Sequence, residues 1–124
     1  MGYRILVVDD SPVLRLMLQE MLESFGHEVV AQADTGAAGI QSYRETKPDL
    51  VTLDISLPDQ DGLSVLKELR KLDPQVRAII ITGNDQRKLQ EQAAALKALG
   101  ILRKPFDVEQ LGALLEKIAP SMNK

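Results

Sequence analysis

Hydrophobic and polar positions along the chain follow two alternating patterns: short apolar runs, and longer stretches with an apolar residue every three or four positions. The short runs are rich in Val, Ile and Leu, and each has Gly, Pro or Asp beside it, which is typical of β-strands. They predict strands over residues 4–8, 29–33, 50–54, 76–82 and 101–103. The run at 50–54 stays mostly apolar up to its final Asp54, which indicates a strand buried on both faces, as in a parallel sheet covered by helices.

The longer stretches predict helices, because apolar residues at this spacing line one helix face. Their expected ranges are 12–25, 37–46, 62–71, 86–99 and 108–119. Ser11 is suited to cap the first helix, Pro12 to begin it and Gly26 to end it. Met17 and Met21 fall at core spacing, and the tail from residue 120 is expected to be frayed.

Strands that alternate with helices in this way predict an α/β protein with a doubly wound parallel sheet. A length of 124 residues fits one domain, and the chain contains no internal repeat or linker-like segment. We therefore expect residues 1–124 to form a single domain with no second domain attached.

The composition of the chain excludes or disfavours several kinds of function. The net charge of −3 does not suggest nonspecific nucleic-acid binding, which favours a basic stripe. The absence of cysteine excludes disulfides and thiolate metal sites. The first residues do not resemble a signal peptide, and no apolar run is long enough to span a bilayer, so a cytoplasmic location is expected.

The residues that end or follow the predicted strands concentrate the reactive side chains. Asp9 and Asp10 follow the first strand, Asp54 ends the third, Thr82 ends the fourth and Lys104 follows the fifth. With right-handed crossovers, the carboxyl ends of all parallel strands meet at one edge of the sheet, where ligands collect in open α/β folds. We therefore expect three carboxylates, one hydroxyl and one ammonium group to converge there.

Carboxylates that lie close together repel one another unless a cation sits among them. Oxygen ligands of this kind, completed by water and a phosphoryl oxygen, suit Mg²⁺. A metal ion and an ammonium group beside a carboxylate can neutralise a phosphoryl group while the carboxylate attacks it in line. The pattern thus predicts magnesium-dependent phosphoryl transfer to an aspartate.

Taken together, Asp9-Asp10, Asp54, Thr82 and the Lys104-Pro105-Phe106 segment resemble the receiver domain of two-component response regulators, over essentially the whole chain. The resemblance implies a flavodoxin-like (βα)5 sheet with strand order 2-1-3-4-5 and a single receiver domain. It also implies that Asp54 is the phosphoacceptor and that the Lys104-Pro105 peptide is cis.

Further roles are carried over from the same resemblance. The implied Mg²⁺ ligands are Asp9, Asp10, Asp54 and Ser56. Asp10 is expected to bind the ion directly, Asp9 mainly through water, and Ser56 through its main-chain carbonyl. Lys104 is expected to pair with the phosphoryl group, and the Thr82 hydroxyl to move toward it when the domain switches.

The implied phosphoryl donor is a sensor histidine kinase or a histidine phosphotransfer protein. The implied output is a change in the surface formed by the fourth helix, fifth strand and fifth helix, which would dock an unidentified effector protein. Many receivers carry Tyr or Phe three residues before the lysine, where this chain has Ile101, so the usual aromatic switch is in doubt. We expect a monomer, or a dimer that forms on phosphorylation.

Three other classes of function fit the sequence less well: a phosphatase, a nucleotide- or flavin-binding protein and a pseudo-receiver. A phosphatase with an aspartate nucleophile usually shows an Asp-x-Asp pair and a substrate-covering insertion, whereas here Asp9 and Asp10 are adjacent and no insertion exists. A nucleotide or flavin site would need a loop rich in Gly or Ser/Thr after the first strand. This chain has Asp9-Asp10-Ser11-Pro12 there, whose carboxylates would repel a phosphate without a metal. A pseudo-receiver, acting only as an interaction module, is disfavoured because the residues for phosphorylation are present. We therefore expect no turnover of an external substrate.

Overall fold

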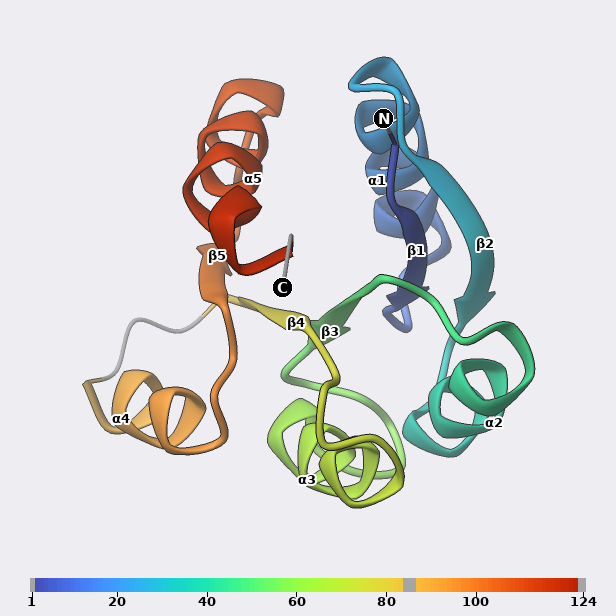
Figure 1. The fold of residues 1–124 in the computed structure, drawn as a ribbon, viewed down its shortest axis with the longest axis vertical. Helices are drawn as coiled ribbons and strands as arrows, with labels where there is room; N and C mark the ends of the chain where they lie inside the picture. The colour runs from blue at the N-terminus through green and yellow to red at the C-terminus, as the bar shows by residue number, and fades with distance from the viewer. Residues whose placement is uncertain (1, 84–86, 123–124) are drawn as a thin grey trace.

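The computed structural model describes residues 2–83 and 87–122, in which strands and helices alternate along the chain (Figure 1). The strands are β1 (Arg4–Val8), β2 (Glu28–Ala33), β3 (Leu50–Asp54), β4 (Ala78–Thr82) and β5 (Gly100–Arg103). The helices are α1 (Pro12–Ser24), α2 (Gly36–Thr46), α3 (Gly62–Leu72), α4 (Arg87–Ala95) and α5 (Val108–Met122). None of the helices in these ranges is long and apolar enough to cross a bilayer.

The strands form one parallel sheet in the order β2-β1-β3-β4-β5, which confirms the predicted architecture. Helices α1 and α5 cover one face of the sheet, and α2, α3 and α4 cover the other (Figure 1). The central strand β3 pairs with β1 and β4, with Val8 opposite Leu53 and Asp54 opposite Ile81. This register brings the carboxyl ends of β1, β3 and β4 to the same edge.

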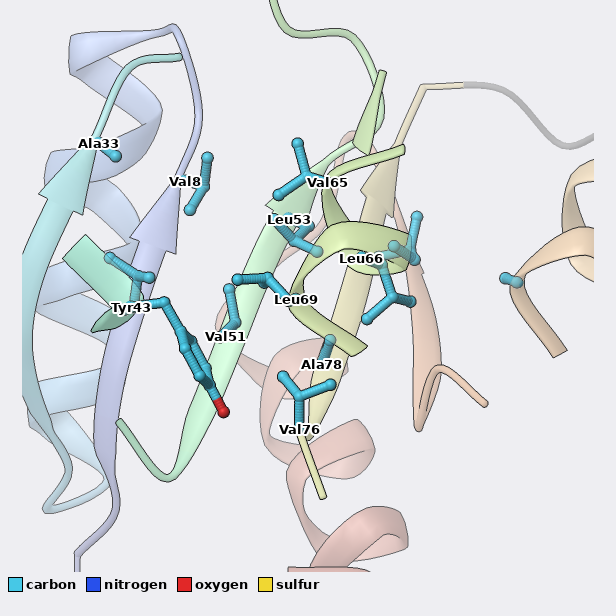
Figure 2. Close-up of a cluster of buried hydrophobic side chains, with 13 residues drawn as sticks. Val8, Ala33, Tyr43, Val51, Leu53, Val65, Leu66, Leu69, Val76 and Ala78 are labelled. Atoms are coloured by element: carbon cyan, nitrogen blue, oxygen red, sulfur yellow. The ribbon is translucent and has the colours of Figure 1, made fainter. Parts of the chain in front are cut away.

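Alternate residues of each strand feed two hydrophobic cores. Ile5 and Val7 of β1 face α1 and α5, whereas Leu6 and Val8 face α2 and α3. Figure 2 shows the second core, in which Leu53 lies near Leu66 and Leu69 of α3. Burying one such aliphatic side chain is worth about 1.5–3 kcal/mol, so the two cores hold the sheet and the edge where the candidate residues lie.

Most element ends lie within two residues of the predicted ones, but the end of α4 was predicted wrongly. The helix ends at Ala95 and not at residue 99; its expected first residue, Gln86, lies outside the described residues. Lys97 adopts a left-handed conformation (φ 61°), and the N–H of Ala98 donates to the Ala93 carbonyl at 3.0 Å, as in a helix-ending turn. The N–H of Leu99 then donates to a β4 carbonyl, so pairing with the sheet ends the helix early.

The expectation of a frayed tail from residue 120 was also wrong for the described part. Helix α5 continues through Pro120 to Met122, whose side chain is buried in the core. The Ser121 carbonyl accepts a hydrogen bond from Arg77 Nε at 3.3 Å. Apolar burial and this contact hold the last turn in place despite the proline.

The prediction that Met17 lies in the core was wrong as well. Leu18 and Leu22 are fully buried beneath α1, whereas Met17 is 40% exposed and Met21 is partly buried against the same core. The apolar stripe of α1 is wider than the surface that the sheet and α5 can cover.

Candidate functional site

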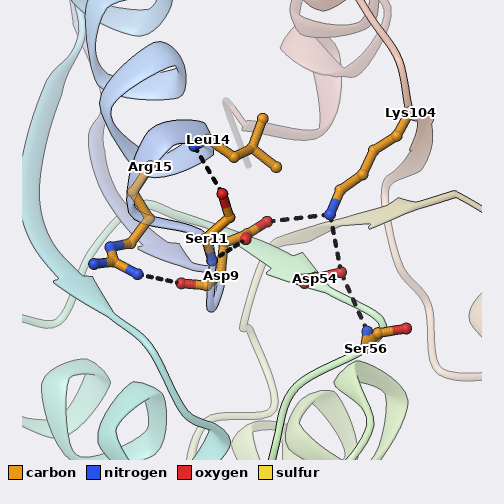
Figure 3. A network of polar contacts seen from close by, with 7 residues as sticks. All are labelled: Asp9, Ser11, Leu14, Arg15, Asp54, Ser56 and Lys104. Atoms are coloured by element: carbon orange, nitrogen blue, oxygen red, sulfur yellow. Dashed lines mark hydrogen bonds and ion pairs between the residues drawn. The ribbon is translucent and has the colours of Figure 1, made fainter.

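Two carboxylates and one ammonium group meet at the carboxyl edge of the sheet (Figure 3). Asp54 is the last residue of β3 and Asp9 follows β1 directly, and the two residues are 2% and 1% exposed. Lys104, which follows β5, places Nζ 3.4 Å from Asp54 Oδ1 and 3.5 Å from Asp9 Oδ2. Lys104 thus bridges the two buried acids, as the positions of the strand ends predict. The Lys104–Pro105 peptide is cis, as expected from the resemblance.

Thr82 ends the strand beside that of Asp54, and Ser56 lies on the loop that follows Asp54. Thr82 is the last residue of β4, next to β3 in the sheet, and is 1% exposed. Its carbonyl accepts the N–H of Lys104 at 2.7 Å, which ties the start of the lysine segment to β4. Ser56 is exposed on the loop after β3 and donates its N–H to Asp54 Oδ1 at 3.2 Å. Each therefore lies at the edge predicted for it.

Asp10 completes an acidic cluster. Carboxylate oxygens of Asp9, Asp10 and Asp54 lie within 4.8 Å of one another, with Asp10 exposed to solvent. Asp9 Oδ1 accepts the N–H of Ser11 at 2.8 Å, whereas Asp9 Oδ2 accepts no hydrogen bond and has the Lys104 ammonium 3.5 Å away. One ammonium does not balance the charge of three neighbouring carboxylates, and such a cluster is costly unless a further cation compensates it. The cluster therefore fits a divalent cation with oxygen ligands.

The loop that carries Ser56 is fastened at its far end. Asp59 accepts the N–H groups of Gly36 and Ala37, at 2.8 and 3.0 Å, and so caps α2 from a neighbouring loop. Asp61 accepts the N–H of Ser64 at 2.7 Å and caps α3. These bonds hold the chain after Asp54 in one path.

Burial, together with the charge of Asp9, opposes ionisation of Asp54. Burial raises the pKa of Asp54 above its ordinary value, and the charge of Asp9 raises it further. The N–H of Ser56 and the ammonium of Lys104 lower the pKa but do not cancel the effect. Ionised Asp54 therefore destabilises the metal-free fold at neutral pH.

This electrostatic cost predicts that Asp54→Asn raises the free energy of unfolding at pH 7 without divalent cations. Because the folded-state pKa lies above the unfolded one, protonation stabilises the wild type as pH falls through the folded-state value. The advantage of the variant should thus shrink toward acid pH. Urea unfolding across this range measures it, and an Asp54→Asn protein less stable than the wild type at pH 7 would contradict the account.

Two contacts at the site were not foreseen from the sequence. One is the capping of α2 by Asp59, and the other is a hydrogen bond from Arg15 to the main-chain carbonyl of Asp9. Neither follows from spacing, because each depends on how one element is turned against another. Ile101 is partly buried against the core beneath α2 and α3, at the position where an aromatic switch residue was considered.

Comparisons with known proteins identify the family of the chain. The family model described as the response regulator receiver domain matches residues 5–116. The chain is 38% identical over 123 residues to the chemotaxis protein CheY of Bacillus subtilis, covering 99% of this chain and 100% of that protein. It is 32% identical to sporulation initiation phosphotransferase F of the same organism, covering 97% and 96%.

A solved structure agrees as well. The crystal structure of the CheX-CheY-BeF3-Mg+2 complex from Borrelia burgdorferi matches with a TM-score of 0.91 at 25% identity, covering 94% of this chain and 89% of that one. The family match spans most of the chain, and the strand order is the one expected from the resemblance. The chain therefore belongs to the response regulator receiver domain family of two-component signalling.

Proposed function

We propose that the chain accepts a phosphoryl group on Asp54 from a phosphohistidine of a sensor histidine kinase or a histidine phosphotransfer protein. The observation that carries this proposal is the position of Asp54, buried at the sheet edge with Lys104 Nζ bridging it to Asp9. The Asp54 carboxylate accepts the N–H of Ser56 and pairs with Lys104, but within the described residues it is not recorded as a helix cap. Burial, and to a lesser extent the charge of Asp9, raises the pKa of Asp54, and a shifted pKa of this kind supports a functional role.

The acidic cluster would hold Mg²⁺ through Asp9, Asp10 and Asp54, with the main-chain carbonyl of Ser56 as a further ligand. When bound, the ion would neutralise charge on the phosphoryl oxygens and orient the group. The grouping of three carboxylates around the single ammonium of Lys104, with an Asp9 Oδ2 that accepts no hydrogen bond, supports this assignment.

The residues of the chain perform the transfer. A carboxylate oxygen of Asp54 attacks phosphorus, a P–O bond forms and the P–N bond to the donor histidine breaks. The Lys104 ammonium, already 3.4 Å from Asp54 Oδ1, pairs with the transferred group. The Thr82 hydroxyl donates a hydrogen bond to it in the switched state.

Phosphorylation adds about −1.5 to −2 charge at this edge. Movement of Thr82 toward the phosphoryl group would shift α4, and with it the surface formed by α4, β5 and α5 on which an effector would dock. Helix α4 buries Leu89 and Ala93, a small apolar contact that leaves it easier to displace than the core helices. Ile101 implies that this shift proceeds without rotation of an aromatic ring at that position.

We propose further that residues 1–124 form one receiver domain that is located in the cytoplasm. The domain is a monomer, or a dimer that forms on phosphorylation, and it does not turn over an external substrate. The Borrelia burgdorferi CheY was crystallised with CheX, BeF3 and Mg²⁺, which supports a protein partner and a metal for this chain by analogy.

Intact-mass spectrometry after incubation with acetyl phosphate tests the proposal. We expect one phosphoryl adduct per wild-type chain that requires Mg²⁺, and none on Asp54→Asn. Asp34→Asn is the matched control, because Asp34 is an exposed acid just after β2, outside the cluster. Phosphate release is measured in parallel, so that rapid loss of the adduct is detected. An adduct on Asp54→Asn, or one independent of Mg²⁺, would contradict the proposal.

A further inference from the structure

Arg15 reaches from the first turn of α1 to the backbone of the acidic cluster. Its Nη1 donates to the main-chain carbonyl oxygen of Asp9 at 2.7 Å, and its Nε donates to Gln32 Oε1 of β2 at 3.2 Å. In Figure 3, Asp9 lies between Arg15 on one side and Lys104 on the other. The two cations thus approach Asp9 from different directions and bind different groups.

The carbonyl that Arg15 binds belongs to the peptide joining Asp9 to Asp10. Strand β1 ends at Val8, so this carbonyl lies beyond the regular strand. On the other side of the residue, the Asp9 N–H donates to the Ala33 carbonyl of β2 at 3.0 Å. Arg15 therefore restrains the peptide that sets the direction of both carboxylates.

A second hydrogen bond keeps the guanidinium in this orientation. Gln32 Nε2 donates to Gln19 Oε1 of α1 at 2.6 Å, so the amide oxygen of Gln32 points toward Arg15. Arginine suits the position because its planar fork donates to two acceptors at once, which the single ammonium of lysine does less well. The pair of contacts ties α1, β2 and the end of β1 together.

We propose that Arg15 is a positioning residue for the divalent-cation site, acting through the Asp9 carbonyl and not through its charge. The inference rests on the proposed function, in that it takes Asp9 and Asp10 as ligands of Mg²⁺. The two effects of Arg15 on metal affinity have opposite signs. Its positive charge opposes cation binding, whereas its hold on the Asp9–Asp10 peptide favours binding by reducing the reorganisation needed.

Calorimetric titration with Mg²⁺ alone, without a phosphoryl donor, separates these effects. We expect Arg15→Met to weaken Mg²⁺ binding about tenfold, in the range found when groups that orient metal ligands are removed. Arg15→Lys, which keeps the charge but not the fork, should show an intermediate loss. Arg44→Met is the matched control, because Arg44 is an exposed cation at the end of α2 and should leave binding unchanged.

A purely electrostatic role of Arg15 predicts different Mg²⁺ affinities for the same variants. If Arg15 acted only by charge, Arg15→Met would bind Mg²⁺ more tightly and Arg15→Lys would match the wild type; either result, or an unchanged affinity of Arg15→Met, would overturn the inference. A wild type that binds no Mg²⁺ would contradict the proposed function itself, and the inference with it.

Gln32→Leu provides a second variant that leaves Arg15 in place. Loss of the Nε contact should weaken Mg²⁺ binding less than Arg15→Met does, and the double variant should be no weaker than Arg15→Met alone, because both changes act on one contact chain. Fully additive losses would contradict a shared path. Thermal unfolding of each variant confirms that a folded protein is titrated, and Gln32→Leu carries the test if Arg15→Met does not fold.

Discussion

Lys104→Met is expected to slow phosphoryl transfer to Asp54 by about 100-fold or more, the usual cost of removing one preorganised group that stabilises charge in a transition state. Lys104 Nζ lies 3.4 Å from Asp54 Oδ1 and 3.5 Å from Asp9 Oδ2, where negative charge would collect in the proposed transfer. Methionine keeps much of the length and apolar stem of lysine but removes its charge. The rate of adduct formation from acetyl phosphate at saturating Mg²⁺ measures the effect.

Lys71→Met is the matched control for this experiment. The Lys71 side chain is 65% exposed on α3 and pairs with Glu68 at 3.6 Å, remote from the sheet edge, so its loss should leave the rate unchanged. A change of less than threefold in Lys104→Met, with a folded protein and intact Mg²⁺ binding, would show that Lys104 does not take part in the transfer.

Gly62→Ala is expected to destabilise the fold by about 2–3 kcal/mol, the upper part of the range for overpacking a close-packed site. A Cβ at residue 62 would overlap the main-chain carbonyl oxygen of Asp54 and lie 3.0 Å from its carbonyl carbon. These are backbone atoms at the end of β3, so neither side can yield without moving α3 or Asp54. Helix propensity alone would make the alanine variant more stable by up to about 1 kcal/mol. A loss of stability would therefore point to the steric overlap as its cause.

Urea unfolding measures this change as a lower midpoint, and Mg²⁺ binding should weaken too because Asp54 is displaced. Gly83→Ala is the control, since a Cβ at residue 83 meets no atom within 4 Å. A Gly62→Ala protein as stable as the wild type would contradict the close approach of α3 to the Asp54 backbone.

The fold was predictable because its strands are short apolar runs with clear boundaries and its helices have regular apolar spacing. The location of four candidate site residues was predictable for the same reason: Asp9, Asp54, Thr82 and Lys104 end or follow strands, and parallel strands end at one edge. The position of each residue at a strand end was sufficient to place it at that edge.

The remaining features depend on packing between elements. The Asp59 carboxylate caps α2 across 23 residues of sequence, and Arg15 reaches Asp9 only because α1 is turned so that this side chain faces β2. The early end of α4 depends on pairing of the next segment with β4. Hydrophobic periodicity contains no information on such contacts, because it specifies which face is buried and not which polar groups meet.

The central claim is that Asp54 is the residue that becomes phosphorylated, and borohydride reduction followed by peptide mapping tests it most directly. Borohydride reduces an aspartyl phosphate to homoserine, which marks the modified position permanently. After incubation with acetyl phosphate and Mg²⁺, we predict homoserine at position 54 and at no other acid. Homoserine at Asp9 or Asp10, or at no position in a protein shown by intact mass to carry a phosphoryl group, would contradict the account.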